Sequence, residues 1–283
     1  MSVPVMPNRP VEARHRVIVP LADGVAIDTI VEGAGPAIVL LPSLGRDSED
    51  YGEVATGLAG SGFKVLRPQP RGLGASRGPM TGITLRDLAA DVAGVIAAQA
   101  DGPAIVLGHA FGNWVARMLA SAHPEAVRGV VVAAAAARSY PPELTDNIRR
   151  IVDPRVANDV RLDLLRRTFF AAGSDPSVWL NGWHGEVRDS QFAASRATRQ
   201  EDWWEAGQAP ILELQAAEDP FMPATNRGDL ARELGPRVTT VLIEGASHAL
   251  MPERPDRVVE AVVEWARNLP VSPYETIGHT IDI

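Results

Sequence analysis

The sequence contains no cysteine, so neither a disulfide nor thiol chemistry contributes to the protein. Basic residues are not in excess: the formal net charge is -8, which argues against nucleic acid or an anionic membrane surface as a partner. No apolar run approaches the ~18 residues of a membrane span. Residues 1–19 also lack the apolar centre of a signal peptide. We therefore expect a cytoplasmic protein with no membrane or nucleic-acid partner.

Short apolar runs alternate with helical patterns along most of the chain. We predict helices over 50–59, 84–99 and 255–269 from their apolar spacing and, at Thr84, from a capping residue. Short buried strands between helices indicate an α/β fold, with a mostly parallel sheet and helices on both faces. The first two strands form a hairpin. The predicted strands are 15–20, 25–30, 37–41, 63–66, 104–107, 130–134, 211–214 and 240–243.

The pattern changes between the sixth and seventh predicted strands. Residues 138–205 carry many arginines, two Asp-Pro steps and short helical patterns, without a clear strand. We interpret this block as a helical cap inserted into a core formed by 1–137 and 206–283. Residues 1–14 resemble a loosely docked arm, and 270–283 form a tail that we do not assign.

One stretch combines an apolar run, a sharp turn and a helix. The run 104–107 leads into Gly108-His109-Ala110-Phe111-Gly112, and a helical pattern follows at once. The two glycines have the spacing of a nucleophile elbow, where the turn is tight and two backbones pass closely. The residue that such an elbow presents is Ala110, which has no nucleophilic atom.

Four motifs in register resemble the α/β-hydrolase fold superfamily over nearly the whole chain. They are Leu40-Leu41-Pro42-Ser43-Leu44-Gly45, the loop 67–76, the elbow, and the pair 216–223 with 245–248. The sequence departs from the family pattern around the expected site. Pro42-Ser43 stands where the family usually has His-Gly, Gln69 replaces an acid, and Asn113 replaces a glycine.

The resemblance implies a set of site residues. His248 would be the general base, and Asp219 would hold its tautomer, with Glu218 as the alternative acid. The backbone N–H groups of Leu44 and Phe111 would form an oxyanion hole. Ala110 would occupy the nucleophile position. His109 is a common neighbour of the nucleophile in this family and need not be catalytic.

Substrate contacts are expected from side chains around this site. Ser43 could add a hydroxyl, and aromatic side chains of the block 138–205 could line an apolar pocket. The same aromatics could instead form a small core of the cap, and His184 could be a solvated surface residue. The residues assigned to substrate binding are Ser43, Trp179, Trp183, His184 and Trp203.

Three hypotheses account for the alanine at position 110. The first is a hydrolase of a small, mostly apolar ester or lactone, inactivated by design or diverged naturally. The second is an enzyme in which His248 and Asp219 act as a base without a covalent intermediate, in water activation, a lyase step or a cofactor-free oxygenase step. The third is a non-catalytic binder on a hydrolase scaffold. Each hypothesis predicts a small-molecule partner and no metal or cofactor. The sequence leaves undecided whether the protein forms a homodimer.

Overall fold

The computed structural model describes residues 13–135, 138 and 141–270 and contains one eight-stranded sheet. Its strand order is β1-β2-β4-β3-β5-β6-β7-β8. The second strand runs antiparallel to its two neighbours, and the other pairs are parallel. The strands are β1 (His15–Pro20), β2 (Ala26–Glu32), β3 (Ala37–Leu41), β4 (Lys64–Pro68), β5 (Ala104–His109), β6 (Val127–Ala133), β7 (Ile211–Ala216) and β8 (Val238–Ile243).

The central strands are buried on both faces, because successive side chains point to opposite sides of the sheet. In β3, Val39 and Leu41 pack into one apolar cluster, and Ile38 and Leu40 pack into the other. The same alternation recurs in β5. This explains why these strands read as continuous apolar runs in the sequence.

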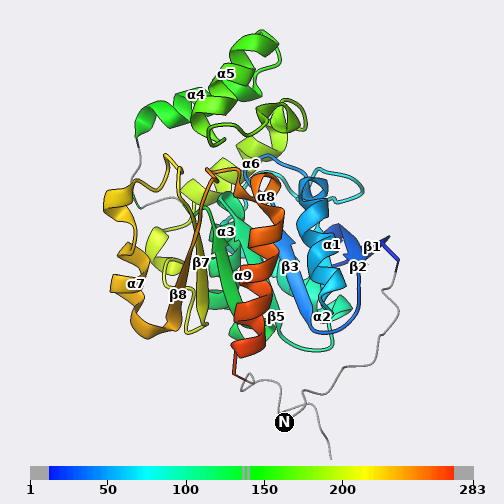
Figure 1. Ribbon diagram of the computed structural model, residues 1–283. Helices are drawn as coiled ribbons and strands as arrows, with labels where there is room; N and C mark the ends of the chain where they lie inside the picture. Colours follow the sequence, from blue (N-terminus) through cyan, green and yellow to red (C-terminus); the bar gives the residue numbers. More distant parts are fainter. Residues whose placement is uncertain (1–12, 136–137, 139–140, 271–283) are drawn as a thin grey trace, which may run out of the picture.

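Helices cover both faces of this sheet (Figure 1). One cluster contains residues of α2 (Leu85–Gln99), α3 (Phe111–Ala122) and α7 (Asp229–Leu234). The other contains residues of α1 (Gly52–Gly60), α8 (Leu250–Glu253) and α9 (Pro255–Asn268). The predicted fold class, a mostly parallel sheet covered by helices, is therefore confirmed.

Three further helices lie between β6 and β7: α4 (Pro142–Val152), α5 (Asn158–Thr168) and α6 (Gly185–Arg196). Figure 1 shows them together at one end of the sheet, the end at which α3 begins. The division into a core and a cap domain remains a prediction. The predicted arm and tail lie almost entirely outside the described residues. Within the described ranges, no helix is long and apolar enough to cross a membrane.

The predicted and observed ends of the elements agree best where a capping residue marks the start of a helix. Thr84 forms a capping box with Asp87, and α2 begins at the next residue. The predicted helix 50–59 is divided in the structure, because Asp47 caps a short 3₁₀ turn over Ser48–Tyr51 before α1 begins. The sixth and eighth strands begin earlier than predicted, at Val127 and Val238. Pairing with neighbouring strands extends both beyond their most apolar residues.

Candidate active site

The elbow between β5 and α3 has a strained backbone at its tip. Ala110 has φ 48° and ψ -112°, a conformation that side-chain-bearing residues rarely adopt. A Cβ on Gly108 would meet the carbonyl carbon of Gly112 at 2.3 Å, and one on Gly112 would meet the Leu41 carbonyl oxygen at 2.4 Å. The glycine spacing therefore reflects close backbone contact, as the sequence predicts. The strain persists although the presented side chain is only a methyl group.

Asn113 explains one of the departures from the family pattern. Its side-chain amide donates to the carbonyl oxygen of Ala110, and its backbone N–H reaches the same oxygen at 3.1 Å. The side chain is buried. A second hydrogen bond thus holds the carbonyl of the strained residue, which a glycine at position 113 could not supply.

His248 and Asp219 form a buried pair. The Nδ1 of His248 lies 3.0 and 3.1 Å from the two carboxylate oxygens of Asp219. The Phe221 N–H donates to Asp219 Oδ1 at 2.8 Å, which fixes the carboxylate. Glu218 instead accepts from the Ala172 N–H, so Asp219 is the acid that pairs with His248. A carboxylate at Nδ1 keeps the proton there and leaves Nε2 as the basic atom.

The Nε2 atom of His248 faces a small apolar cavity, which we call the dyad cavity. It measures about 60 Å³. Among the described residues the side-chain hydrogen bonds of His248 are made by Nδ1, and none is made by Nε2. The ring of Phe221 lies 4.2 Å from the imidazole, centroid to centroid. The cavity is lined by Ser43, Leu44, Ala110, Phe111, Trp114, Ile148, Phe169, Phe192, Phe221 and His248.

Both predicted oxyanion donors line this cavity. Neither the Leu44 N–H nor the Phe111 N–H has a backbone acceptor in the described part of the chain. The loop that carries Leu44 is held from α6: the Gly45 N–H donates to Gln191 Oε1 at 2.7 Å, and the His184 N–H donates to the Gly45 carbonyl at 3.0 Å. The residues of both predicted oxyanion donors therefore line the same small cavity as His248 and Ala110.

A buried chain of hydrogen bonds connects the oxyanion loop to His248. The Ser43 N–H donates to the Tyr51 hydroxyl at 2.9 Å, and that hydroxyl lies 2.9 Å from His109 Nδ1. His109 Nε2 lies 2.7 Å from the His248 carbonyl oxygen, so Nε2 must carry the proton and Nδ1 must accept from Tyr51. Burial, followed by the nearby His248, lowers the pKa of His109 to about 3 and keeps it neutral. His109 is thus a positioning residue.

The other residues assigned to substrate binding are placed differently. Ser43 lines the dyad cavity, but Trp179, Trp183, His184 and Trp203 do not. Trp179 and Trp183 belong to an apolar cluster with Phe169, which is the small core that the sequence also allowed. His184 precedes α6. Trp203 stacks on Trp114 and lies in the core cluster beneath α3, so it supports the cavity wall from behind.

Several cavity residues had no signal in the sequence. Trp114, Phe169, Phe192, Phe221 and Ile148 come from separate elements, and only the tertiary structure brings them together. Tyr51 is equally unmarked, because its partner His109 is 58 residues away. Trp114 and Phe221 are partial exceptions, because Trp114 follows the elbow and Phe221 lies in the motif 216–223.

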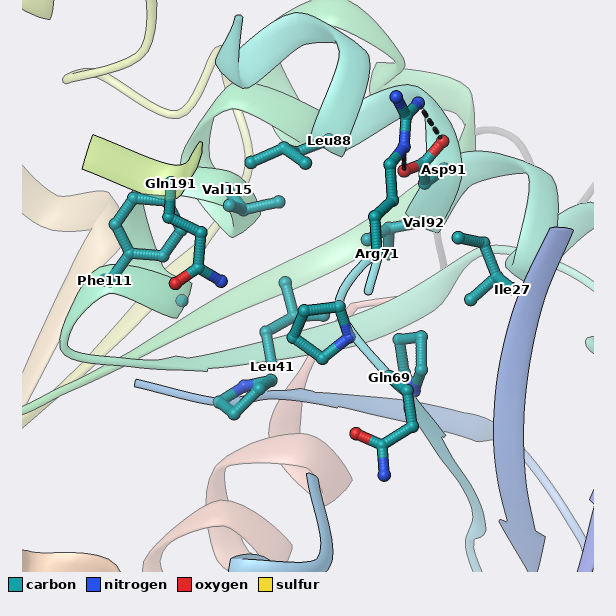
Figure 2. A pocket seen from close by; sticks show the side chains of 14 residues that line it. Ile27, Leu41, Gln69, Arg71, Leu88, Asp91, Val92, Phe111, Val115 and Gln191 are labelled. Atoms are coloured by element: carbon teal, nitrogen blue, oxygen red, sulfur yellow. Dashed lines mark hydrogen bonds and ion pairs between the residues drawn. The ribbon is translucent and has the colours of Figure 1, made fainter. Parts of the chain in front are cut away.

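The loop 67–76 supports the site from a neighbouring pocket (Figure 2). Arg71 forms a bidentate buried ion pair with Asp91, at 2.6 and 2.8 Å. Gln69 is directed away from that pair in Figure 2. Its amide accepts from the Ser48 N–H at 3.1 Å and donates to Asp47 at 2.7 Å. Gln69 therefore fills the position of the family's acid as a structural link.

No group of three or more His, Cys, Asp or Glu side chains that could hold a metal occurs in the ranges that the structure describes.

Two curated proteins are similar to parts of this chain. A curated relative, the 2-(acetamidomethylene)succinate hydrolase of Mesorhizobium japonicum, is 32% identical over 100 residues, which cover 35% of this chain and 36% of that protein. A protein of Mycobacterium phage D29 that carries the name of a non-heme haloperoxidase is 32% identical over 136 residues, 48% of each chain. The chain thus matches less than half the length of these two relatives.

Solved structures of two esterases share the fold. An esterase of Thermogutta terrifontis has a TM-score of 0.72 and 22% identity, covering 92% of this chain and 100% of that one. An esterase of Exiguobacterium antarcticum has a TM-score of 0.74 and 17% identity, covering 90% and 100%. The model of the alpha/beta hydrolase family matches residues 38–261, which include the elbow, Asp219 and His248. The chain therefore belongs to the alpha/beta hydrolase family.

Proposed function

We propose that the protein hydrolyses a small, mostly apolar ester or lactone by direct attack of water, with His248 as the general base. The observation that carries this proposal is the buried His248–Asp219 pair, 3.0 Å apart, beside a methyl group at the tip of a strained elbow. A carboxylate that orients an imidazole serves proton transfer, and simple ligand binding does not require it. The curated relative named as a hydrolase supports the reaction class.

The reaction follows from the atoms around the cavity. His248 Nε2 takes a proton from water as the water oxygen bonds to the substrate carbonyl carbon. The negative charge that develops on the carbonyl oxygen is stabilised by the N–H groups of Leu44 and Phe111. The C–O bond to the leaving group then breaks, and the leaving oxygen takes the proton from His248. One ester and one water yield one acid and one alcohol.

The methyl group of Ala110 excludes the usual covalent route. It has neither a lone pair nor a transferable proton, so no acyl-enzyme forms at position 110. In serine hydrolases that lack a triad member, an oxyanion hole and binding alone still accelerate the reaction ~10³–10⁴-fold over water. In the proposed reaction His248 adds the activation of water to this residual acceleration. The apolar wall and the volume of about 60 Å³ favour a small apolar acyl group.

The test compares the natural chain with Ala110→Ser on short 4-nitrophenyl esters and lactones. We expect slow, steady turnover by the natural chain without an acyl-enzyme in quenched intact-mass spectra. Ala110→Ser should place a hydroxyl next to His248, react with a fluorophosphonate probe and accumulate an acyl-enzyme. Fluorophosphonate labelling of the natural chain would contradict the proposal.

Asp219→Asn is the matched variant for the orienting carboxylate. It preserves shape and burial but removes the charge that stabilises the imidazolium. We expect it to lower kcat by about 10²–10⁴-fold, with little change in KM. The matched control is Glu218→Gln, because Glu218 is adjacent but bonds the Ala172 N–H and not His248. Equal losses in the two variants would refute the role of Asp219.

A further inference from the structure

A second cavity lies beside the dyad cavity, and we call it the arginine cavity. It measures about 290 Å³ and lies between α4 and α6. Its lining residues are Thr145, Ile148, Arg149, Arg188, Asp189, Phe192 and Arg196. Ile148 and Phe192 also line the dyad cavity. These two side chains therefore form a shared wall, with the base on one side and the arginines on the other.

The arginine cavity is basic although the chain is acidic. Three arginines and one aspartate line it, in a protein of net charge -8. Such a local reversal of sign attracts anions and raises their local concentration. Guanidinium groups match the geometry of a carboxylate, with which they form paired, charge-assisted hydrogen bonds.

The arginines of this cavity form only local ion pairs with other described residues of the chain. Arg149 pairs with the nearby Asp146 at 2.8 Å, and both side chains are exposed. Arg188 pairs with the adjacent Asp189 at 2.7 Å. The Arg188 side chain is half-buried, whereas its partner Asp189 is exposed. An exposed pair such as Arg149–Asp146 contributes about 0–1 kcal/mol, so a ligand can displace it. Arg196 has no ion pair with a described residue.

The helix α6 connects the arginines to the reaction centre. Arg188, Phe192 and Arg196 follow one another at intervals of four residues, so they share a helix face. A Cβ at Gly45 would lie 2.9 Å from the Cβ of Arg188, so α6 packs directly on the loop that carries Leu44. A group held by these arginines would thus lie next to the oxyanion loop.

We propose that the arginine cavity binds a carboxylate of the substrate. The substrate would then have a small apolar acyl portion at His248 and a carboxylate beyond Ile148 and Phe192. Half-esters of short dicarboxylic acids, and lactones that bear a carboxylate, have this form. The inference rests on the proposed function, since it specifies the class of ester that the same site receives.

The experiment compares two esters that differ by one charge. Mono-4-nitrophenyl glutarate ends in a carboxylate, and methyl 4-nitrophenyl glutarate ends in a neutral ester. We expect kcat/KM at low salt to be at least about tenfold higher for the charged ester, which corresponds to one charge-assisted contact. Added salt should reduce this preference, because the arginines are partly exposed.

Substitution of the arginines should act on the charged ester alone. Arg149→Gln and Arg196→Gln are each expected to lower its kcat/KM by about five- to tenfold, mainly through KM. Hydrolysis of the neutral ester should change less than about twofold. Arg167→Gln is the control, because it removes the same charge from α5 at a residue that lines neither cavity. Equal kcat/KM for the two esters, or equal losses on both, would overturn the proposal.

A binding measurement separates this inference from the proposed reaction. Glutarate is titrated into the natural chain and into the double variant Arg149→Gln/Arg196→Gln, with binding measured by calorimetry. If neither ester is hydrolysed but glutarate binds and the double variant loses that binding, the hydrolase proposal fails and the anion site stands. If both esters are hydrolysed equally and glutarate does not bind, the anion site fails and the hydrolase proposal stands.

Discussion

Tyr51→Phe removes one oxygen from the buried chain that links the oxyanion loop to His248. The phenylalanine ring fills the same place in the apolar cluster under α1, so no cavity of side-chain size results. The loss is confined to two hydrogen bonds of 2.9 Å, one from the Ser43 N–H and one to His109 Nδ1. The substitution therefore isolates the hydrogen-bonding role of the hydroxyl.

The expected destabilisation comes from the two partners left behind. Ser43 and His109 are buried, and each loses its hydrogen-bond partner at the affected atom. A buried donor or acceptor without a partner costs about 1–3 kcal/mol, so the two groups left by Tyr51→Phe should lower the free energy of unfolding by roughly 2–6 kcal/mol. The turnover number should fall as well, because Ser43 precedes the oxyanion donor Leu44.

The assay is urea unfolding at pH 7, with kcat for a short ester measured in parallel. Ser61→Ala is the control for loss of one hydroxyl. Among the described residues the Ser61 hydroxyl hydrogen-bonds only the Gly57 carbonyl, at the end of α1, so the substitution should cost about 1 kcal/mol or less. A change below about 0.5 kcal/mol for Tyr51→Phe, with kcat unchanged, would refute the claim that this chain of bonds positions the site.

Three further substitutions test the structure around the site. Arg71→Met leaves the Asp91 carboxylate buried and unpaired, so chemical denaturation should show a loss of about 3–5 kcal/mol, and a loss under 1 kcal/mol would contradict the pairing. Ala110→Gly relieves the strain at φ 48° but adds chain entropy to the unfolded state, so stability should rise by about 1 kcal/mol, and a decrease would argue against strain. His109 stays neutral in the folded protein down to about pH 3 and is protonated in the unfolded chain below about 6.5, so its contribution is complete above pH 6.5 and is lost as the pH falls towards 3. Replacing it in His109→Gln should flatten the stability profile by up to about 1.4 kcal/mol per pH unit between pH 6.5 and 5, and an unchanged slope would contradict a neutral His109.

Much of the fold was predictable because the relevant signals are local. Glycine is required at positions 108 and 112, because a Cβ there would lie 2.3 and 2.4 Å from neighbouring backbone atoms. Thr84 and Asp87 mark the start of α2 through bonds within one turn of the chain. The acid and the base could be located because each follows a strand and has a recognisable neighbourhood.

The rest of the site depends on contacts between distant segments. A sequence contains no sign that Tyr51 lies against His109, or that Trp203 stacks on Trp114 and not on a ligand. Nothing in the sequence indicates that the arginines at 149, 188 and 196 share a cavity, because that cavity exists only when α4 and α6 are adjacent. Spacing along the chain reveals the residues of the candidate site, and tertiary packing determines their surroundings.

The most direct test of the account is the rate of ester hydrolysis by the natural chain and by His248→Ala, each purified identically and measured at pH 8. His248 provides the only imidazole nitrogen that faces the dyad cavity among the described residues, so its removal should lower kcat by about 10²–10⁴-fold and leave the fold intact by circular dichroism. Equal kcat values for the two proteins would contradict base catalysis by His248 and, with it, the proposed reaction.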